Sequence, residues 1–123
     1  MNISIDQQDN SRIAIVDSPD VIIHNAQDAL DLMASIYYNH NECHKILLEK
    51  SNLTEAFFEL KTGLAGDILQ KYVNYNVKLA IVGDLDAYDS KSLKDFIYEC
   101  NKGKQVFFLK DRQDALRALH DIA

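Results

Sequence analysis

Three short apolar runs, separated by long amphipathic segments, constrain the fold of this chain more than any other feature. The runs are Ile46–Leu48, Val77–Val82 and Val106–Leu109, and their length and composition are typical of buried strands. Between them, apolar residues recur at helical spacing over segments of ten residues or more. Strands that alternate with such helices pair in parallel through right-handed crossovers. The sequence therefore predicts an α/β domain with a mainly parallel sheet.

The first 23 residues follow a different pattern. Residues Asn2–Asp6 alternate isoleucine with polar side chains, and Ile13–Val16 is a second apolar run after a polar turn. Two strands this close in sequence predict an antiparallel hairpin at the amino-terminal end. After the break at Pro19, the run Val21–Ile23 predicts a short further strand.

About four helices are expected. Asn25, Ser90 and Asp111 each precede an amphipathic segment and are suited to cap its first turn. A longer apolar stripe runs from Leu53 to Val73, and Asn52 with Glu55 resembles a capping box at its start.

Two glycines interrupt this stripe. Gly63 and Gly66 each disfavour a helix interior by up to ~1 kcal/mol relative to alanine. We therefore expect a break near Thr62, with a short helical segment before it and a longer one after it.

Length and composition predict one domain, residues 1–123. A chain of 123 residues with 47% hydrophobic side chains can bury a single core without disulfides. The net charge of −6 disfavours general binding to nucleic acid or anionic membranes. There are two cysteines, no signal-peptide pattern and no apolar stretch near the ~20 residues of a membrane span, so a cytoplasmic location is expected.

The segment Lys91–Arg112 is locally basic, with six cationic residues against three acidic ones. Two interpretations remain open. A cationic face would fit an acidic protein or a small anion, whereas a solvated helix face followed by a lysine-rich turn has the same composition.

Ligands of parallel α/β sheets usually bind beyond the carboxyl ends of the strands. The loops expected there carry Glu49, Ser51, Gly83 and Asp84, and we call this edge the carboxyl rim. Glu49, Asp84 and Asp86 could together bind a hard cation such as Mg²⁺, but turn and capping roles explain the same residues.

Other chemistry has weaker signals. His40, Cys43 and His44 share a helical face in principle and could bind Zn²⁺, although the segment also fits a polar turn. No phosphate-binding glycine loop is present, and no cofactor is predicted. None of the four histidines lies in the rim loops, so the sequence identifies no catalytic residue.

The stretch FFELKTGLAGDILQKYVNYNVKLAIVGD, continuing into SKSLKDFIYECNKGKQVFF, resembles a bacterial family of domains of unknown function. The chain is more distantly similar to STAS domains, the fold of anti-sigma-factor antagonists. Glu49–Thr54 resembles the acidic strand end and loop of those domains, and Lys61–Leu64 resembles their helix opening. The resemblance places Thr62 at the phosphorylated hydroxyl, whereas Leu60 and Lys61 replace the acidic and first hydroxyl residues before it.

Two functional hypotheses follow. The resemblance implies a non-enzymatic STAS-like regulatory module that binds a protein partner, either a regulator or a second copy of itself, around Thr62, Gly63 and Gly66. The alternative is a small-molecule binding domain, or an enzyme, that uses the carboxyl rim. A purely structural role also remains, in which Thr62 starts a helix and the two glycines allow close packing.

Overall fold

The computed structural model describes residues 1–123 and contains a five-stranded sheet with four α-helices. The strands are β1 (Asn2–Gln8), β2 (Ser11–Asp17), β3 (Lys45–Glu49), β4 (Lys78–Val82) and β5 (Val106–Leu109). The helices are α1 (Ala26–Asn39), α2 (Leu64–Asn74), α3 (Lys91–Lys102) and α4 (Arg112–His120). Three 3₁₀ turns lie between β3 and α2, at Lys50–Asn52, Glu55–Phe58 and Leu60–Thr62. No helix is long and apolar enough to span a bilayer.

The sheet has the predicted topology. Its strand order is β1-β2-β3-β4-β5, with β1 antiparallel to β2 and the remaining pairs parallel. The amino-terminal hairpin and the parallel pairing of the three apolar runs are thus both confirmed. The carboxyl ends of β3, β4 and β5 lie at one edge, because Glu49 pairs with Val82 and Val82 pairs with Leu109.

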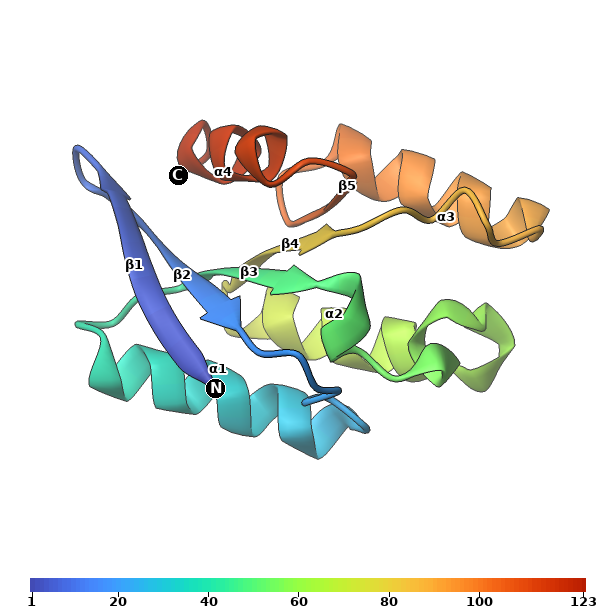
Figure 1. The fold of residues 1–123 in the computed structure, drawn as a ribbon, viewed down its shortest axis with the longest axis horizontal. Helices are drawn as coiled ribbons and strands as arrows, with labels where there is room; N and C mark the ends of the chain where they lie inside the picture. Colours follow the sequence, from blue (N-terminus) through green and yellow to red (C-terminus); the bar gives the residue numbers. More distant parts are fainter.

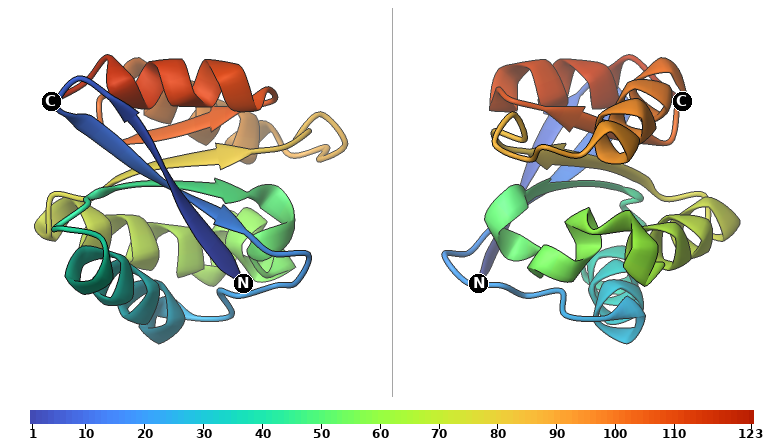
Figure 2. Two further views of the ribbon diagram at one scale, coloured as in Figure 1. Left: turned by 60° about the vertical axis from the view of Figure 1, so that its left-hand side comes forward. Right: turned by 90° about the vertical axis from the view of Figure 1, so that its right-hand side faces the viewer.

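Helices cover both faces of the sheet (Figures 1 and 2). α1 and α2 lie on one face, and α4 lies on the other. α3 packs against β5, and its apolar side chains belong to the same hydrophobic core as those of α1 and α2. Every residue of β4 is buried, as expected of a central parallel strand covered on both faces.

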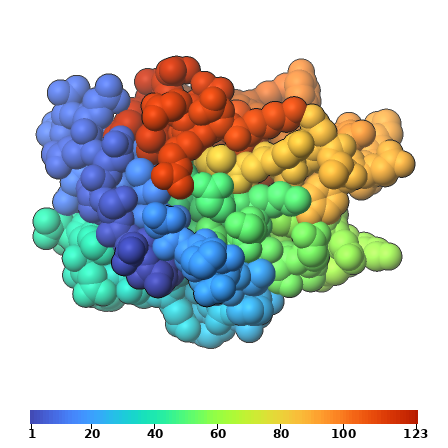
Figure 3. Space-filling model, in the orientation of Figure 1, coloured from blue at the N-terminus to red at the C-terminus, as the bar shows by residue number.

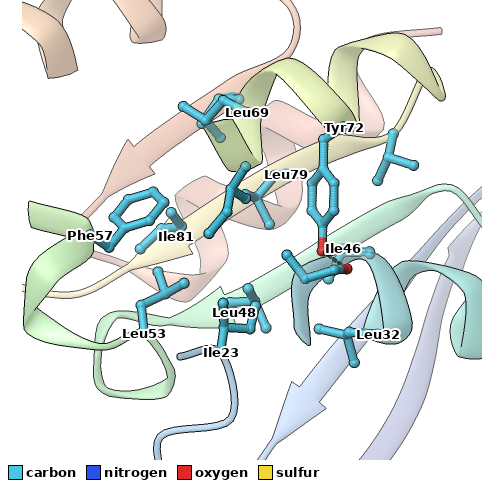
Figure 4. Close-up of a cluster of buried hydrophobic side chains, with 14 of the residues drawn as sticks. Ile23, Leu32, Ile46, Leu48, Leu53, Phe57, Leu69, Tyr72, Leu79 and Ile81 are labelled. Carbon is cyan, nitrogen blue, oxygen red and sulfur yellow. Dashed lines mark hydrogen bonds between the residues drawn. The ribbon is translucent and has the colours of Figure 1, made fainter. Parts of the chain in front are cut away.

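The larger of the two cores lies between the sheet, α1 and α2 (Figure 4). Tyr72 is fully buried there, and its hydroxyl donates a hydrogen bond to the Ala29 carbonyl oxygen at 2.8 Å. Burial raises the pKa of this phenol far above its usual value of 10.0. The smaller core joins α4 to the opposite face through Ala115 and Leu119.

The predicted helix caps form. The Asn25 side chain accepts from the Asp28 amide at 2.9 Å, and the Ser90 hydroxyl accepts from the Leu93 amide at 3.2 Å. The Asp111 carboxylate accepts from the Gln113 amide at 2.8 Å. These bonds satisfy amide groups that have no partner within the helix.

The expected strand at Val21–Ile23 does not form, and that prediction is wrong. Ile23 makes only an isolated parallel bridge with Leu53. The amides of Ile22 and Ile23 both donate to the Asn52 carbonyl oxygen, at 2.9 and 3.0 Å. The segment is therefore bound to a 3₁₀ turn instead of extending the sheet.

The capping box predicted at Asn52 and Glu55 is also wrong. Asn52 is fully buried, and its side-chain oxygen accepts from the Glu49 amide at 2.9 Å. Its NH₂ group donates to the carbonyl oxygens of Ser18 and Asp20, each at 2.9 Å. The break expected near Thr62 is confirmed, but the chain before it forms 3₁₀ turns and only Leu64–Asn74 is α-helical.

Candidate functional site

The carboxyl rim is closed by its own side chains. The Arg112 guanidinium donates to the Glu49 carboxylate at 3.0 Å. The Lys50 side chain lies against Gly83 so closely that a Cβ on Gly83 would be 2.6 Å from the Lys50 Cβ. The Asp84 carboxylate accepts from the Asp86 amide at 2.9 Å. The carboxylates of Glu49 and Asp84 thus each accept a hydrogen bond from a neighbouring group at this edge.

No main cleft of the surface is lined by Glu49, Ser51, Gly83 or Asp84. Ser51 is exposed on the 3₁₀ turn that follows β3. The structure thus brings the four rim residues to one edge, but they form none of its main clefts.

Thr62 lies on an exposed 3₁₀ turn directly before α2. Its hydroxyl lies 2.7 Å from the Ala56 carbonyl oxygen and 2.8 Å from that of Glu59, and both are acceptors for its single hydrogen. The hydroxyl oxygen in turn accepts from the Leu64 amide at 3.2 Å. The side chain therefore stabilises the local turn while remaining at the surface.

The two glycines beside Thr62 differ in what they require. Gly63 has φ of 79°, a left-handed conformation that glycine adopts without steric cost. Gly66 is exposed, and a Cβ added to it would meet no heavy atom within 4 Å. The close packing that the structural interpretation assigned to Gly66 is therefore absent.

A shallow groove of about 840 Å³ lies beside the Thr62 turn. Its aromatic part is Phe58 and Tyr88, whose rings stack with centroids 5.3 Å apart. The Tyr88 hydroxyl donates to the Glu55 carboxylate at 2.6 Å. Burial, together with this carboxylate, raises the pKa of Tyr88 far above its usual value. The groove is lined by Phe58–Lys61, Tyr88–Ser90 and Ser92.

Most cationic groups of the basic segment are paired with carboxylates. Lys91 pairs with Asp95 at 2.8 Å and Lys102 with Glu99 at 3.6 Å, both on α3. Lys110 pairs with Asp86, and Arg112 pairs with Glu49 as described above. Four of the six cationic groups of this segment thus have a carboxylate partner.

Neither metal hypothesis fits the structure. No three histidine, cysteine, aspartate or glutamate side chains lie close enough together to bind one ion. Cys43 is buried, and its thiol lies 3.5 Å from the carbonyl oxygens of Arg12 and Lys45. The structure therefore does not bring together the three side chains of either hypothesis, those of His40, Cys43 and His44 or those of Glu49, Asp84 and Asp86.

A polar cluster at the opposite edge was not predicted from the sequence. We call it the Ser11 cluster, and it consists of Asp6, Ser11, Lys45 and His120. His120 Nε2 lies 2.7 Å from the Asp6 carboxylate, and its Nδ1 lies 2.8 Å from the Ser11 hydroxyl. Lys45 Nζ donates to the same hydroxyl at 2.9 Å. Asp6 and His120 are 114 positions apart, so no spacing pattern could have paired them.

The comparisons with known proteins identify the family. The family model of a domain of unknown function, DUF4180, matches residues 8–119, and the chain belongs to this family. Among curated proteins, none is significantly similar in sequence. A solved structure of a proposed anti-sigma factor antagonist from Thermotoga maritima is similar, with 14% identity and a TM-score of 0.44. The similarity covers 96% of this chain and 94% of that one. The sequence identity and the TM-score are too low for this similarity to assign a function.

Proposed function

We propose that this domain is a regulatory or protein-interaction module of STAS-like type in the bacterial cytoplasm, and that it binds its partner without acting on it as an enzyme. Its partner is a regulatory protein or a second copy of the chain, bound at the turn that carries Thr62 and at the adjoining groove. The proposal requires neither a cofactor nor a metal ion.

One contrast within the structure carries the proposal. The carboxyl rim, where a small ligand of an α/β domain usually binds, is closed by the Glu49–Arg112 pair and by Lys50 over Gly83. The turn that carries Thr62 is instead exposed and adjoins an open groove with aromatic side chains. This contrast favours a surface for a protein over a pocket for a metabolite.

The position of Thr62 also suggests how binding is regulated. Phosphorylation would replace the hydroxyl hydrogen that is shared between the Ala56 and Glu59 carbonyl oxygens. It would add nearly two negative charges on the 3₁₀ turn directly before α2, close to the exposed Glu59. The modification therefore changes both the shape of the turn and its charge, and a partner that presents an acidic surface to the turn would be repelled.

The test is a quantitative pull-down from native cytosol that compares the wild-type domain with Thr62→Glu and Thr62→Val. Valine removes the same hydroxyl without adding charge, so it controls for the lost hydrogen bonds. A Gln113→Glu variant adds one charge to the exposed first turn of α4, on the opposite face of the sheet. We expect Thr62→Glu to lose partner recovery, and Gln113→Glu to retain it.

Two further measurements bear on the same proposal. Phosphopeptide mapping of the native protein is expected to find phosphate on Thr62. Analytical ultracentrifugation reports whether the partner is a second copy of the chain. Equal recovery of every partner by Thr62→Glu and the wild type would exclude the switch, and a monomer that enriches no protein would exclude the interaction module.

A further inference from the structure

The Ser11 cluster is independent of the proposed function, because it lies at the amino-terminal ends of the parallel strands. Its four side chains come from β1, β2, β3 and α4. The amino-terminal hairpin and α4 lie side by side, as Figure 3 shows. The side chains of Lys45 and His120 are almost completely buried, with exposures of 3% for the lysine residue and 6% for the histidine side chain. Their positions are therefore fixed by the surrounding structure.

One arrangement of the hydrogen-bond network satisfies every group from within the cluster, with Lys45 as an ammonium group and His120 as a neutral imidazole. An ammonium group can only donate, so the Ser11 oxygen accepts from Lys45 and its own hydrogen donates to His120 Nδ1. His120 then carries its proton on Nε2 and donates it to the Asp6 carboxylate. This assignment of the tautomer follows from the network. A hydroxyl is thus aligned on a neutral imidazole whose other nitrogen is oriented by a carboxylate.

This arrangement contains the parts that activate a serine nucleophile: a hydroxyl, a base within hydrogen-bond reach and a group that orients the base. Lys45 adds a cation beside the reacting oxygen. Of its three N–H donors, one bonds Ser11 and a second bonds the Ile122 carbonyl oxygen at 2.6 Å. The third is free to stabilise an oxyanion that forms next to Ser11.

The cluster borders a surface cleft. Ser11 is only partly buried, and with Lys45 and His120 it lines an open cleft of about 830 Å³. The Arg12 guanidinium lines the same cleft and bonds the Asn41 carbonyl oxygen, with no carboxylate partner. The lining of this cleft is mostly polar. Such a lining favours a small polar acyl group over a long acyl chain.

We propose that Ser11 is the nucleophile of an acyl-transfer site that accepts esters of small polar acids. His120 takes the Ser11 proton as Oγ attacks the ester carbonyl carbon, and Lys45 donates to the resulting oxyanion. Collapse breaks the bond to the leaving alkoxide, which takes the proton from His120 and departs as an alcohol. Water, deprotonated by His120, then attacks the acyl-serine, releases the carboxylic acid and returns the proton to Ser11. Asp6 is a positioning residue that holds the imidazole.

The probes are p-nitrophenyl acetate and a fluorophosphonate, applied to the full chain. The fluorophosphonate is expected to label Ser11, as identified by peptide mass spectrometry. The ester is expected to give an initial burst of p-nitrophenolate and an acetyl group on Ser11. His120→Gln is expected to slow labelling by about 100-fold, a typical contribution of a general base.

Matched variants separate this chemistry from a structural role. Ser4→Ala removes an exposed hydroxyl from the same hairpin and is expected to leave labelling unchanged. Asp6→Asn is expected to slow labelling, and Asp6→Glu, which restores a carboxylate, is expected to recover part of the rate. A folded wild-type chain with no label on Ser11 would overturn the proposal, as would labelling that does not respond to His120→Gln. In either case the cluster only ties α4 to the hairpin.

Discussion

Asn52 offers the sharpest test of how this fold is stabilised. The residue is fully buried and its side chain makes three hydrogen bonds, all to backbone groups. Two of these groups, the carbonyls of Ser18 and Asp20, belong to the segment that joins the hairpin to α1. Each buried bond contributes about 1 kcal/mol, so Asn52→Ala is expected to lower the free energy of unfolding by about 3 kcal/mol.

A second substitution at the same position separates hydrogen bonding from packing. Asn52→Asp keeps the shape of the side chain and one acceptor for the Glu49 amide. Its other oxygen, however, would face the two carbonyl oxygens to which the asparagine NH₂ group now donates. At neutral pH the aspartate would bring two unsatisfied carbonyls and a buried negative charge together. We therefore expect Asn52→Asp to be at least as destabilising as Asn52→Ala.

Urea unfolding measures both effects, with the midpoint expected to fall and the slope to stay constant. The melting temperature of Asn52→Ala should fall by about 10 °C for a domain of this length. Asn74→Ala, at the exposed end of α2, serves as the control and is expected to change stability by less than about 0.5 kcal/mol. A loss below about 1 kcal/mol in Asn52→Ala, or a milder effect of aspartate than of alanine, would refute the reasoning.

Two further predictions concern single hydrogen bonds. Tyr72→Phe removes the hydroxyl that donates to the Ala29 carbonyl oxygen, so we expect it to lower the free energy of unfolding in urea by about 1 kcal/mol. The control is Tyr38→Phe, on a side chain that is 82% exposed, and it is expected to leave stability unchanged. The His24 amide donates to the Asp28 carboxylate and lowers the pKa of that carboxylate below its usual 3.8. The ionised Asp28 therefore stabilises the fold above pH 3.8, and this contribution is lost as the pH falls through the lower pKa of the folded state. We expect Asp28→Asn to reduce the pH dependence of unfolding in this acidic range, and an unchanged pH dependence would contradict the assignment.

The sequence by itself determined the elements whose causes are local. The runs Ile46–Leu48, Val77–Val82 and Val106–Leu109 become parallel strands, because a short run that is wholly or almost wholly apolar can be buried on both faces. The helix caps at Asn25, Ser90 and Asp111 involve residues at most three positions apart. Such signals can be read from neighbouring residues without knowledge of the fold.

Only the tertiary structure decided how distant polar groups pair. Asn52 bonds residues more than 30 positions away, which turned a predicted helix cap into a buried bridge. Arg112 reaches Glu49 across 63 positions and closes part of the rim, and Asp6 reaches His120 across 114. The physical reason is that hydrophobic periodicity specifies which face of an element is buried, whereas the partner of a polar group depends on strand register and on the packing of elements remote in sequence.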